Sequence, residues 1–394
     1  MIIFLNCLCR CKAAKRMNNM KKTDKSNLIV CILFCVFLFS ESVALLIFPG
    51  KDYSENEKRF LKTPPAFSMQ NILSGDYAEA LEAYFADRIP GRTFFVGLHS
   101  YMDQILGIRA GKEIVSGKSG RLYEAPVQAE ENIISDNITA IQEFAEKIGT
   151  DVSLMLIPSA GYIMKEDIPK GTDAYQDGEI ADFIASRTAE RIHTIDLFSL
   201  FETYDERKDL YYATDHHWTS LGAYMAYSAL SEEMNFPALP ADRYDVETAE
   251  DFYGTTYSRS ALWLTPSESM ELWHSGADFI VSCPENETEH SGVFYTEHLK
   301  EADKYPVFLD GNHSLVRIEN KNALTERKLL VVRDSFTNCL GCFLADSFSE
   351  VVLVDLRYYK YPVSDLVKME NIDDVLITYG VGNFMNNSYL GFLE

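Results

Sequence analysis

Segments patterned like β-strands and α-helices alternate along most of this chain of 394 residues, and that alternation restricts the possible folds most strongly. Strands joined by helices are typical of a parallel sheet with crossover connections. The expected strands are 152–157, 192–197, 329–332, 351–356 and 375–379, and the expected helices are 137–149, 178–191, 219–234, 337–345 and 363–369. Functional side chains gather at the carboxyl ends of the strands in such sheets. We therefore predict an α/β domain with its site at that edge.

Residues 236–328 interrupt the alternation. They are rich in Tyr, Asp, Ser and Glu, and we expect an insertion of mixed structure that borders the site. Further upstream, residues 75–92 have the apolar spacing of an amphipathic helix that stops at Pro90-Gly91. The predicted organisation is a cytoplasmic basic tail at 1–27, a transmembrane signal anchor at 28–48, a linker with N-terminal helices at 49–116 and the α/β domain at 117–394.

Residues 28–48 form an apolar run of 21 residues in which Glu41 is the only charged side chain. A run of this length crosses a bilayer as a helix. Residues 1–27 hold seven Lys and Arg against a single Asp, and the positive-inside rule places such a tail in the cytoplasm. The small residues at 40–44 also fit a cleaved signal peptide. We favour an uncleaved anchor because the apolar run resumes after Ser42, and either interpretation places the rest of the chain outside the cytoplasm.

The charge of the chain is strongly divided. The whole chain carries −23, residues 1–27 carry +6 and Glu41 carries −1, so the residues after Phe48 carry −28. A surface of that sign argues against nucleic acid as a partner. Cys339 and Cys342 have the spacing of a redox motif, but they fall in the apolar helix expected after residue 336. We expect them to be buried thiols.

Two motifs far apart in the chain carry the chemistry. Asp215 and His217 stand two residues apart, so in an extended segment both side chains project to one side while His216 projects to the other. Ser335 follows the apolar strand 329–332 at the expected start of a helix. A serine at a strand-to-helix turn with an Asp-x-His pair is the composition of a Ser-His-Asp catalytic site. The unpaired N–H groups of the helix start would form an oxyanion hole.

Other interpretations of these residues stay open. An Asp-Ser pair after a strand is also a common helix N-cap. Asp215, His216 and His217 are residue types that bind zinc or manganese, as in metal phosphoesterases, although no acidic partner motif accompanies them. The histidines also fit a purely structural role. Our interpretation of the site requires no metal or cofactor.

The stretch Asp215–Tyr224, together with Arg333–Phe336, resembles the DHHW family of bacterial envelope proteins. That family is similar to the alginate O-acetyltransferase accessory proteins, which resemble SGNH hydrolases. The resemblance extends to 54–59, 87–92, 117–123 and 355–359. It implies an SGNH-like fold and matches Asp215, His217 and Ser335 to the catalytic residues of the acetyltransferases. Arg333 departs from the glycine of their Gly-Asp-Ser motif, which leaves the oxyanion hole undefined.

The resemblance also implies partners and a location. It suggests a single-pass protein of the bacterial cytoplasmic membrane whose extracytoplasmic domain acetylates or deacetylates an envelope polysaccharide. Its acyl donor would be a multipass membrane O-acyltransferase. Asn338 and Arg357 are candidate substrate-binding residues. The alternative for Asn338 is helix capping or solvent exposure, and the alternative for Arg357 is a surface ion pair. The rival hypothesis is a non-catalytic glycan-binding or scaffolding protein, supported by five aromatic residues of the insertion, namely Tyr253, Tyr257, Trp263, Trp273 and Tyr295.

Overall fold

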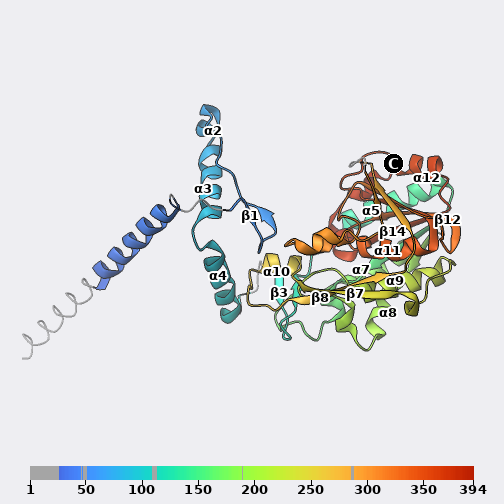
Figure 1. Cartoon of the computed structure of the whole chain (residues 1–394), viewed down its shortest axis with the longest axis horizontal. Helices are drawn as coiled ribbons and strands as arrows, with labels where there is room; N and C mark the ends of the chain where they lie inside the picture. The colour runs from blue at the N-terminus through green and yellow to red at the C-terminus, as the bar shows by residue number, and fades with distance from the viewer. Residues whose placement is uncertain (1–25, 46, 48–50, 109–112, 189, 285–287) are drawn as a thin grey trace, which may run out of the picture. The chain divides into compact units, whose positions relative to one another are not determined.

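The computed structural model describes residues 26–45, 47, 51–108, 113–188, 190–284 and 288–394 (Figure 1). Most of the basic tail, including Cys7, Cys9 and Cys11, therefore lies outside the described residues. The chain divides into two compact units. The first comprises the chain up to Ser54 with Arg59–Val96, and the second comprises Glu55–Lys58 with Gly97–Glu394.

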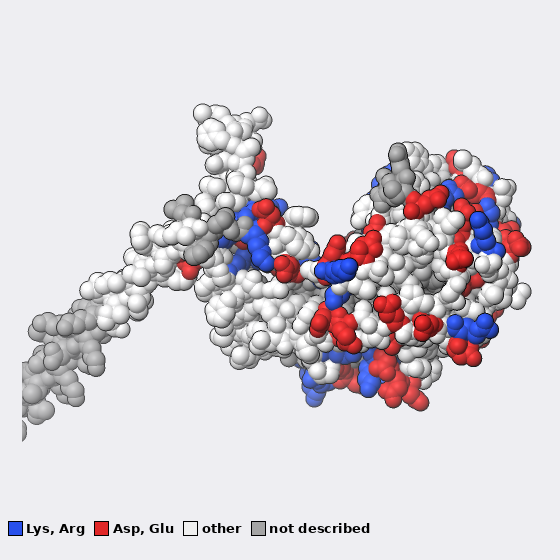
Figure 2. Space-filling model, in the orientation of Figure 1, with Lys and Arg blue, Asp and Glu red and all other residues white. Residues whose placement is uncertain are grey.

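The first unit contains an apolar helix and several short elements. The helix Ser26–Leu45 is, among the described residues, the one that is long and apolar enough to cross a membrane. Its surface is almost free of charged side chains (Figure 2). The elements that follow are β1 (Tyr53–Ser54), β2 (Arg59–Phe60), α2 (Met69–Ser74), α3 (Asp76–Arg88) and the start of α4 (Arg92–Leu106). The helix expected over 75–92 therefore ends at Arg88, because Pro90 and the positive φ of Gly91 interrupt it.

An eight-stranded sheet in the order β10-β9-β11-β13-β12-β14-β5-β6 organises the second unit. Its strands are β5 (Val152–Ile157), β6 (Ile192–Ile195), β9 (Phe279–Cys283), β10 (Thr288–Ser291), β11 (Leu315–Asn320), β12 (Thr325–Arg333), β13 (Phe348–Val354) and β14 (Asp374–Gly380). The five strands from β13 to β6 are parallel, which confirms the α/β fold expected from the sequence. The three strands β9, β10 and β11 come from the insertion and extend the sheet in antiparallel pairing.

Helices cover both faces of this sheet (Figure 1). After α4, the helices of the second unit are α5 (Glu131–Ile148), α6 (Ala160–Ile163), α7 (Asp177–Arg187), α8 (Leu197–Thr203), α9 (Ser220–Glu233), α10 (Thr255–Ser260), α11 (Thr337–Ser347), α12 (Val363–Glu370) and α13 (Val381–Asn386). Two small hairpins, β3–β4 (Ile114–Ser116, Leu122–Glu124) and β7–β8 (Asp245–Phe252, Glu268–His274), complete the regular structure with the short 3₁₀ turns η1 (Arg207–Leu210), η2 (Ala241–Arg243), η3 (Thr296–Lys300), η4 (Tyr305–Val307) and η5 (Tyr389–Phe392).

Strand β12 lies between β13 and β14, which confirms that the strand preceding Ser335 is central and parallel. Its side chains alternate between two hydrophobic cores. Leu329 and Val331 pack in the core that contains residues of α9 and α11, while Leu330 and Val332 pack in the core that contains residues of α5 and α12. The sequence of a strand that is buried on both faces is an unbroken apolar run, which is the pattern seen at 329–332. This packing fixes the position of the residues that follow.

Candidate active site

The loop that carries Asp215 and His217 is held at both ends. Tyr211 and Trp218 form an isolated antiparallel bridge, and the Tyr212 N–H donates to the His217 carbonyl over 3.2 Å. The Trp218 indole is fully buried and donates to the Phe336 carbonyl over 3.0 Å. Because Phe336 follows Ser335, this bond ties the loop directly to the turn that carries the serine.

Glu268 of β8 supports the same loop from the other side. Its carboxylate accepts the backbone N–H groups of Ala213 and Thr214, each over 2.7 Å, and the Thr214 hydroxyl over 2.5 Å. Burial raises the pKa of Glu268, although these donors oppose that effect. No sequence pattern marked Glu268, because it lies in the insertion and meets the loop only after the hairpin has formed.

The turn at Ser335 is fixed by its neighbour Asp334. One oxygen of Asp334 accepts the Phe336 N–H over 3.1 Å. The other accepts the Gly380 N–H and the Asn383 side-chain amide, each over 2.8 Å. Asp334 therefore joins the end of β12 to the end of β14 and to α13. Ser335 itself is half-buried and stands in the chain between Asp334 and helix α11.

Asp215, His217 and Ser335 form a continuous line of hydrogen bonds. His217 Nδ1 lies 2.6 Å from Asp215 Oδ1, and His217 Nε2 lies 2.8 Å from Ser335 Oγ. With the carboxylate ionised, Nδ1–H donates to Asp215, which leaves Nε2 as the acceptor for the serine hydroxyl. The structure thus brings together the three residues that the sequence singled out. The imidazole can thus act as a base toward the serine hydroxyl, while the carboxylate holds the other side of the ring.

Asp215 is buried with donors on both oxygens. Oδ2 accepts the Thr255 N–H over 2.6 Å, and Oδ1 accepts the backbone N–H of His217 over 2.9 Å. Burial alone would raise its pKa, but the charges of His217 and His216 and the hydrogen bonds from His217 hold the pKa of Asp215 well below its usual range. The carboxylate is therefore ionised throughout the neutral range.

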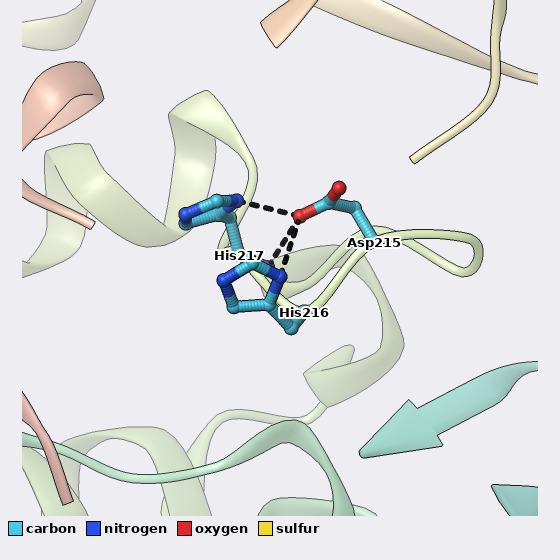
Figure 3. A group of neighbouring side chains, drawn as sticks. All are labelled: Asp215, His216 and His217. Carbon is cyan, nitrogen blue, oxygen red and sulfur yellow. Dashed lines mark hydrogen bonds and ion pairs between the residues drawn. The ribbon is translucent and has the colours of Figure 1, made fainter. Parts of the chain in front are cut away.

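The sequence-based prediction that His216 projects away from Asp215 is wrong. His216 Nδ1 lies 3.3 Å from Asp215 Oδ1 and 2.6 Å from the Thr255 hydroxyl, and the two imidazole rings are 3.8 Å apart between centroids (Figure 3). The cause is the local backbone, which follows consecutive bends at this point and does not form an extended strand. Side chains alternate between two sides only in extended backbone.

Aromatic rings enclose His217. The Tyr305 ring stacks on the imidazole at 3.9 Å with an interplanar angle of 7°, and Phe336 contacts it edge-on at 5.0 Å. Burial, followed by the proximity of His216, lowers the pKa of His217, while Asp215 acts in the opposite direction. The net result favours a neutral imidazole, which is the form that accepts a proton. Tyr305 lies in the insertion, and no sequence motif indicated its role.

The backbone N–H groups near Ser335 are mostly engaged. Those of Thr337 and Asn338 donate to the carbonyls of Asp334 and Ser335, and that of Phe336 donates to the Asp334 side chain. Within the described part of the chain, the Ser335 N–H donates to no other residue. Of the N–H groups expected at the helix start, the one on Ser335 is thus the donor left open.

The two candidate substrate-binding residues have protein partners. Asn338 is buried, accepts from the guanidinium of Arg333 over 2.7 Å and donates to Asn312 over 3.1 Å. Arg357 pairs with the buried Asp355 through two nitrogens, with Nε and Nη2 at 2.9 and 2.5 Å. Arg333 is fully buried, and burial lowers its pKa. In this structure Asn338 anchors Arg333, the residue that stands where the resemblance leads one to expect glycine.

Asp215, His216 and His217 also satisfy the spacing of a metal site. One ligand atom from each of them lies within 4.8 Å of the other two. Within this group, His217 Nδ1 and Asp215 Oδ1 are already hydrogen-bonded to each other. The same group therefore fits a triad or three metal ligands, and the two interpretations predict opposite responses to a chelator.

The two cysteines with redox-motif spacing and the five aromatic residues of the insertion are buried or half-buried. Cys339 and Cys342 are buried, as expected, and burial raises the pKa of Cys339 to about 12. The five aromatic residues considered for glycan binding are buried or half-buried. Tyr257, for example, packs between Tyr253 and Trp263 at 4.4 and 5.4 Å.

Gly254 permits the close approach of Asp215, which gives a testable prediction. A Cβ at position 254 would lie 2.2 Å from Asp215 Cβ and 2.4 Å from Oδ2. We expect Gly254→Ala to displace the carboxylate and lower kcat for hydrolysis of p-nitrophenyl acetate by roughly 100-fold. Gly391→Ala is the matched control, because a Cβ there meets nothing within 4 Å. Equal activity of the two variants would show that the position of Asp215 does not matter.

Two family models match the chain. The model described as DHHW protein covers residues 57–149, and the model described as SGNH hydrolase-like domain, acetyltransferase AlgX, covers residues 114–260. A crystal structure of a DHHW family protein from Eubacterium siraeum aligns with a TM-score of 0.61 and 26% identity, over 69% of this chain and 92% of that one. The chain is a relative of the DHHW proteins. The SGNH-like fold that the sequence resemblance implied is confirmed with it.

Two further comparisons give a shared fold and a partial sequence similarity. Bacillus cereus PatB1, solved with a sulfonyl adduct, has the same fold, with a TM-score of 0.63, 21% identity, and coverage of 73% of this chain and 100% of that one. A Pseudomonas aeruginosa protein named probable alginate O-acetylase AlgJ is 26% identical over 204 residues, which is 48% of this chain and 52% of AlgJ. The chain thus spans about half the length of the curated relatives it matches. Neither family model reaches Ser335.

Proposed function

We propose that this protein is a membrane-anchored acetyltransferase that moves an acetyl group onto a hydroxyl of a cell-envelope polysaccharide through an acyl-Ser335 intermediate. The observation that carries the proposal is the line of hydrogen bonds from Asp215 through His217 to Ser335, at 2.6 and 2.8 Å. The similarity to proteins named as O-acetylases supports the choice of acetyl as the transferred group.

The geometry accounts for each proton in the reaction. Ser335 Oγ attacks the carbonyl carbon of an acetyl ester while His217 Nε2 takes the hydroxyl proton. As the intermediate collapses, the imidazolium returns that proton to the leaving alkoxide, and the acetyl group remains on Ser335. An acceptor hydroxyl then gives its proton to His217 Nε2 and attacks the acyl carbon. As the bond from the acyl carbon to Ser335 Oγ breaks, the imidazolium passes that proton to Ser335 Oγ. Asp215, ionised and buried, stabilises the imidazolium in both halves.

The oxyanion that forms in each half needs a donor. The Ser335 N–H is open in the described structure and belongs to the attacking residue, which places it beside the developing charge. We therefore assign it one position of the oxyanion hole. Transfer in preference to hydrolysis depends on whether a sugar hydroxyl or water reaches the acyl-serine, and an acetylesterase uses the same three residues.

The anchor and the partners complete the proposal. The helix Ser26–Leu45 fits the predicted span at 28–48 and would hold the protein as a single-pass protein of the bacterial cytoplasmic membrane. The domain at 117–394 would then act in the extracytoplasmic space. A multipass membrane O-acyltransferase remains our proposed acyl donor, as the resemblance to the O-acetyltransferase accessory proteins implies.

Covalent labelling of Ser335 tests this function. Full-length protein in neutral detergent is treated with an arylsulfonyl fluoride, a reagent chosen because a sulfonyl adduct was obtained with PatB1. We expect one adduct per chain on Ser335, with parallel loss of p-nitrophenyl acetate hydrolysis. Ser335→Ala should take up no label. Labelling at another residue, or hydrolysis that continues after complete labelling, would contradict the assignment.

The low pKa of His217 predicts the pH dependence. Because burial holds that pKa below the ordinary value of 6.5, the imidazole stays neutral, and therefore active as a base, down to pH values under 6.5. We expect kcat/KM for p-nitrophenyl acetate to be constant near pH 7 and to decline only below pH 6.5. His216→Gln should move the decline to higher pH, because His216 contributes to the lowering. A decline centred above 6.5 in the unmodified protein would contradict this assignment.

A further inference from the structure

A cavity of about 550 Å³ lies beside the proposed triad. Its walls include His216 and Phe336, the sequence neighbours of His217 and Ser335, so it adjoins the reacting groups. The other walls come mainly from β4 and the residues after it (122–128), the start of α6 and the segment 380–387 around α13, together with Glu113 and Arg259. Its volume is that of an ordinary small-molecule site, sufficient for a sugar residue.

Three asparagines, two in α13 and one directly after it, give this cavity a hydrogen-bonding preference. Their amide nitrogens donate to Asp334 Oδ2, the Gly382 carbonyl and the Asn383 carbonyl, over 2.8, 3.0 and 3.1 Å respectively. Each partner can only accept, so each amide nitrogen is fixed in place and each amide oxygen is left over. In the described part of the chain, no residue donates to these three oxygens, which belong to Asn383, Asn386 and Asn387. They suit a ligand that offers O–H donors.

The charges of the cavity favour the same kind of ligand. Arg259 is the one Lys or Arg among the described residues that line it. Glu113 binds Arg259 through two nitrogens at 3.1 and 3.2 Å, and Glu124 binds a third at 2.5 Å. Asp177, a further carboxyl of the wall, accepts the Ser159 N–H over 2.7 Å. The carboxyl groups outnumber the single guanidinium, which is already occupied, so a carboxylate ligand would meet repulsion.

We propose that the acceptor is an uncharged, hydroxyl-rich polysaccharide, and that polyuronates are poor acceptors. This rests on the proposed acetyl transfer and adds the substrate class. Sugar hydroxyls would donate to the amide oxygens of Asn383, Asn386 and Asn387. The net charge of −28 after Phe48 acts in the same direction by repelling polyanions. Acidic side chains are spread over the visible face of the second unit (Figure 2). The acceptor therefore differs from alginate, a polyuronate, after which the curated relatives are named.

A pair of acceptors that differ only in charge tests the inference. Mannuronate oligosaccharides and the same oligosaccharides after carboxyl reduction are offered to the full-length protein with p-nitrophenyl acetate as donor. We expect acetylation of the reduced oligosaccharide to be about tenfold faster or more, at equal consumption of donor. Equal acetylation, or preference for the uronate, would overturn the inference.

Variants that remove negative charge from the cavity wall test whether the discrimination against uronates arises in the cavity. In Glu113→Gln/Glu124→Gln, Arg259 loses both ion-pair partners and the wall loses two negative charges. We expect the ratio of uronate to neutral transfer to rise several-fold. The matched control is Glu143→Gln/Glu146→Gln on the exposed side of α5, which removes the same charge away from the cavity. If both double variants raise the ratio equally, the preference reflects overall charge and not this cavity.

Binding measured without turnover separates this inference from the proposed function. Calorimetric titration of the Ser335→Ala variant with each oligosaccharide should give a Kd about tenfold lower for the reduced form. That result combined with no labelling of Ser335 would overturn acetyl transfer and uphold the ligand class. Acetyl transfer through Ser335 with equal or tighter uronate binding would uphold the proposed function and overturn the inference.

Discussion

Replacing Ser335 by alanine is expected to lower kcat/KM for acetyl ester hydrolysis by roughly 10⁴-fold or more, because the nucleophile and its covalent intermediate are lost. The fold should persist, since the half-buried hydroxyl contacts only His217 Nε2 at 2.8 Å and no backbone group of the described chain depends on it. Far-UV circular dichroism and Tm check the fold. Ser388→Ala, which alters an exposed serine, should retain full activity.

The same experiment extends to a double-mutant cycle. His217→Ala should cause a loss of similar size, because without the base the serine hydroxyl stays protonated. The combined variant should be no worse than either single variant, since the two residues act as one unit. His193→Ala serves as the control for an exposed histidine. Losses that multiply in the double variant would mean that Ser335 and His217 act independently.

Asp215→Asn is expected to fold and to lose roughly 10⁴-fold in kcat. Asp215 Oδ1 accepts both the Nδ1–H and the backbone N–H of His217, while Oδ2 accepts the Thr255 N–H. An amide supplies only one oxygen, so the asparagine cannot satisfy both sides. If its NH₂ group faces His217, the ring takes the tautomer with hydrogen on Nε2, which cannot accept the serine proton.

Chelation distinguishes this explanation from a metal site at the same residues. In the triad interpretation, EDTA leaves the activity of the unmodified protein unchanged, because no step uses a metal ion. Activity that disappears with EDTA and returns with zinc or manganese, while Ser335→Ala remains active, would instead make Asp215, His216 and His217 metal ligands. The close approach of all three residues makes this control informative.

The sequence predicted the central part of the fold well, because a strand buried on both faces leaves an unbroken apolar run. Strand β12 and its Asp-Ser turn were visible for this reason. The origin of the outer strands was not predictable in the same way. β9, β10 and β11 belong to the insertion, and their pairing with β13 depends on contacts between distant segments. Local pattern carries no information about such pairing.

The candidate site likewise contains residues that a local motif indicates and residues that reach it only through the fold. Asp215, His217 and Ser335, which the structure brings together, could be proposed because two short motifs carry chemistry in their own composition. Thr255, Glu268 and Tyr305 were missed because each contacts the site from the insertion and has an ordinary sequence neighbourhood. His216 was misplaced because a period of two was assumed where the backbone follows bends. The orientation of a loop residue depends on its anchors, here Trp218 and Glu268.

Direct detection of the acyl-enzyme tests the central claim. Full-length protein is mixed with p-nitrophenyl acetate, quenched in acid within the first turnovers and digested for peptide mass spectrometry. We predict that the peptide containing Ser335 gains the mass of one acetyl group, that fragmentation places it on Ser335, and that this acetyl disappears when an acceptor polysaccharide is added before the quench. An unmodified Ser335 peptide during active turnover, with Ser335→Ala equally active, would contradict the account.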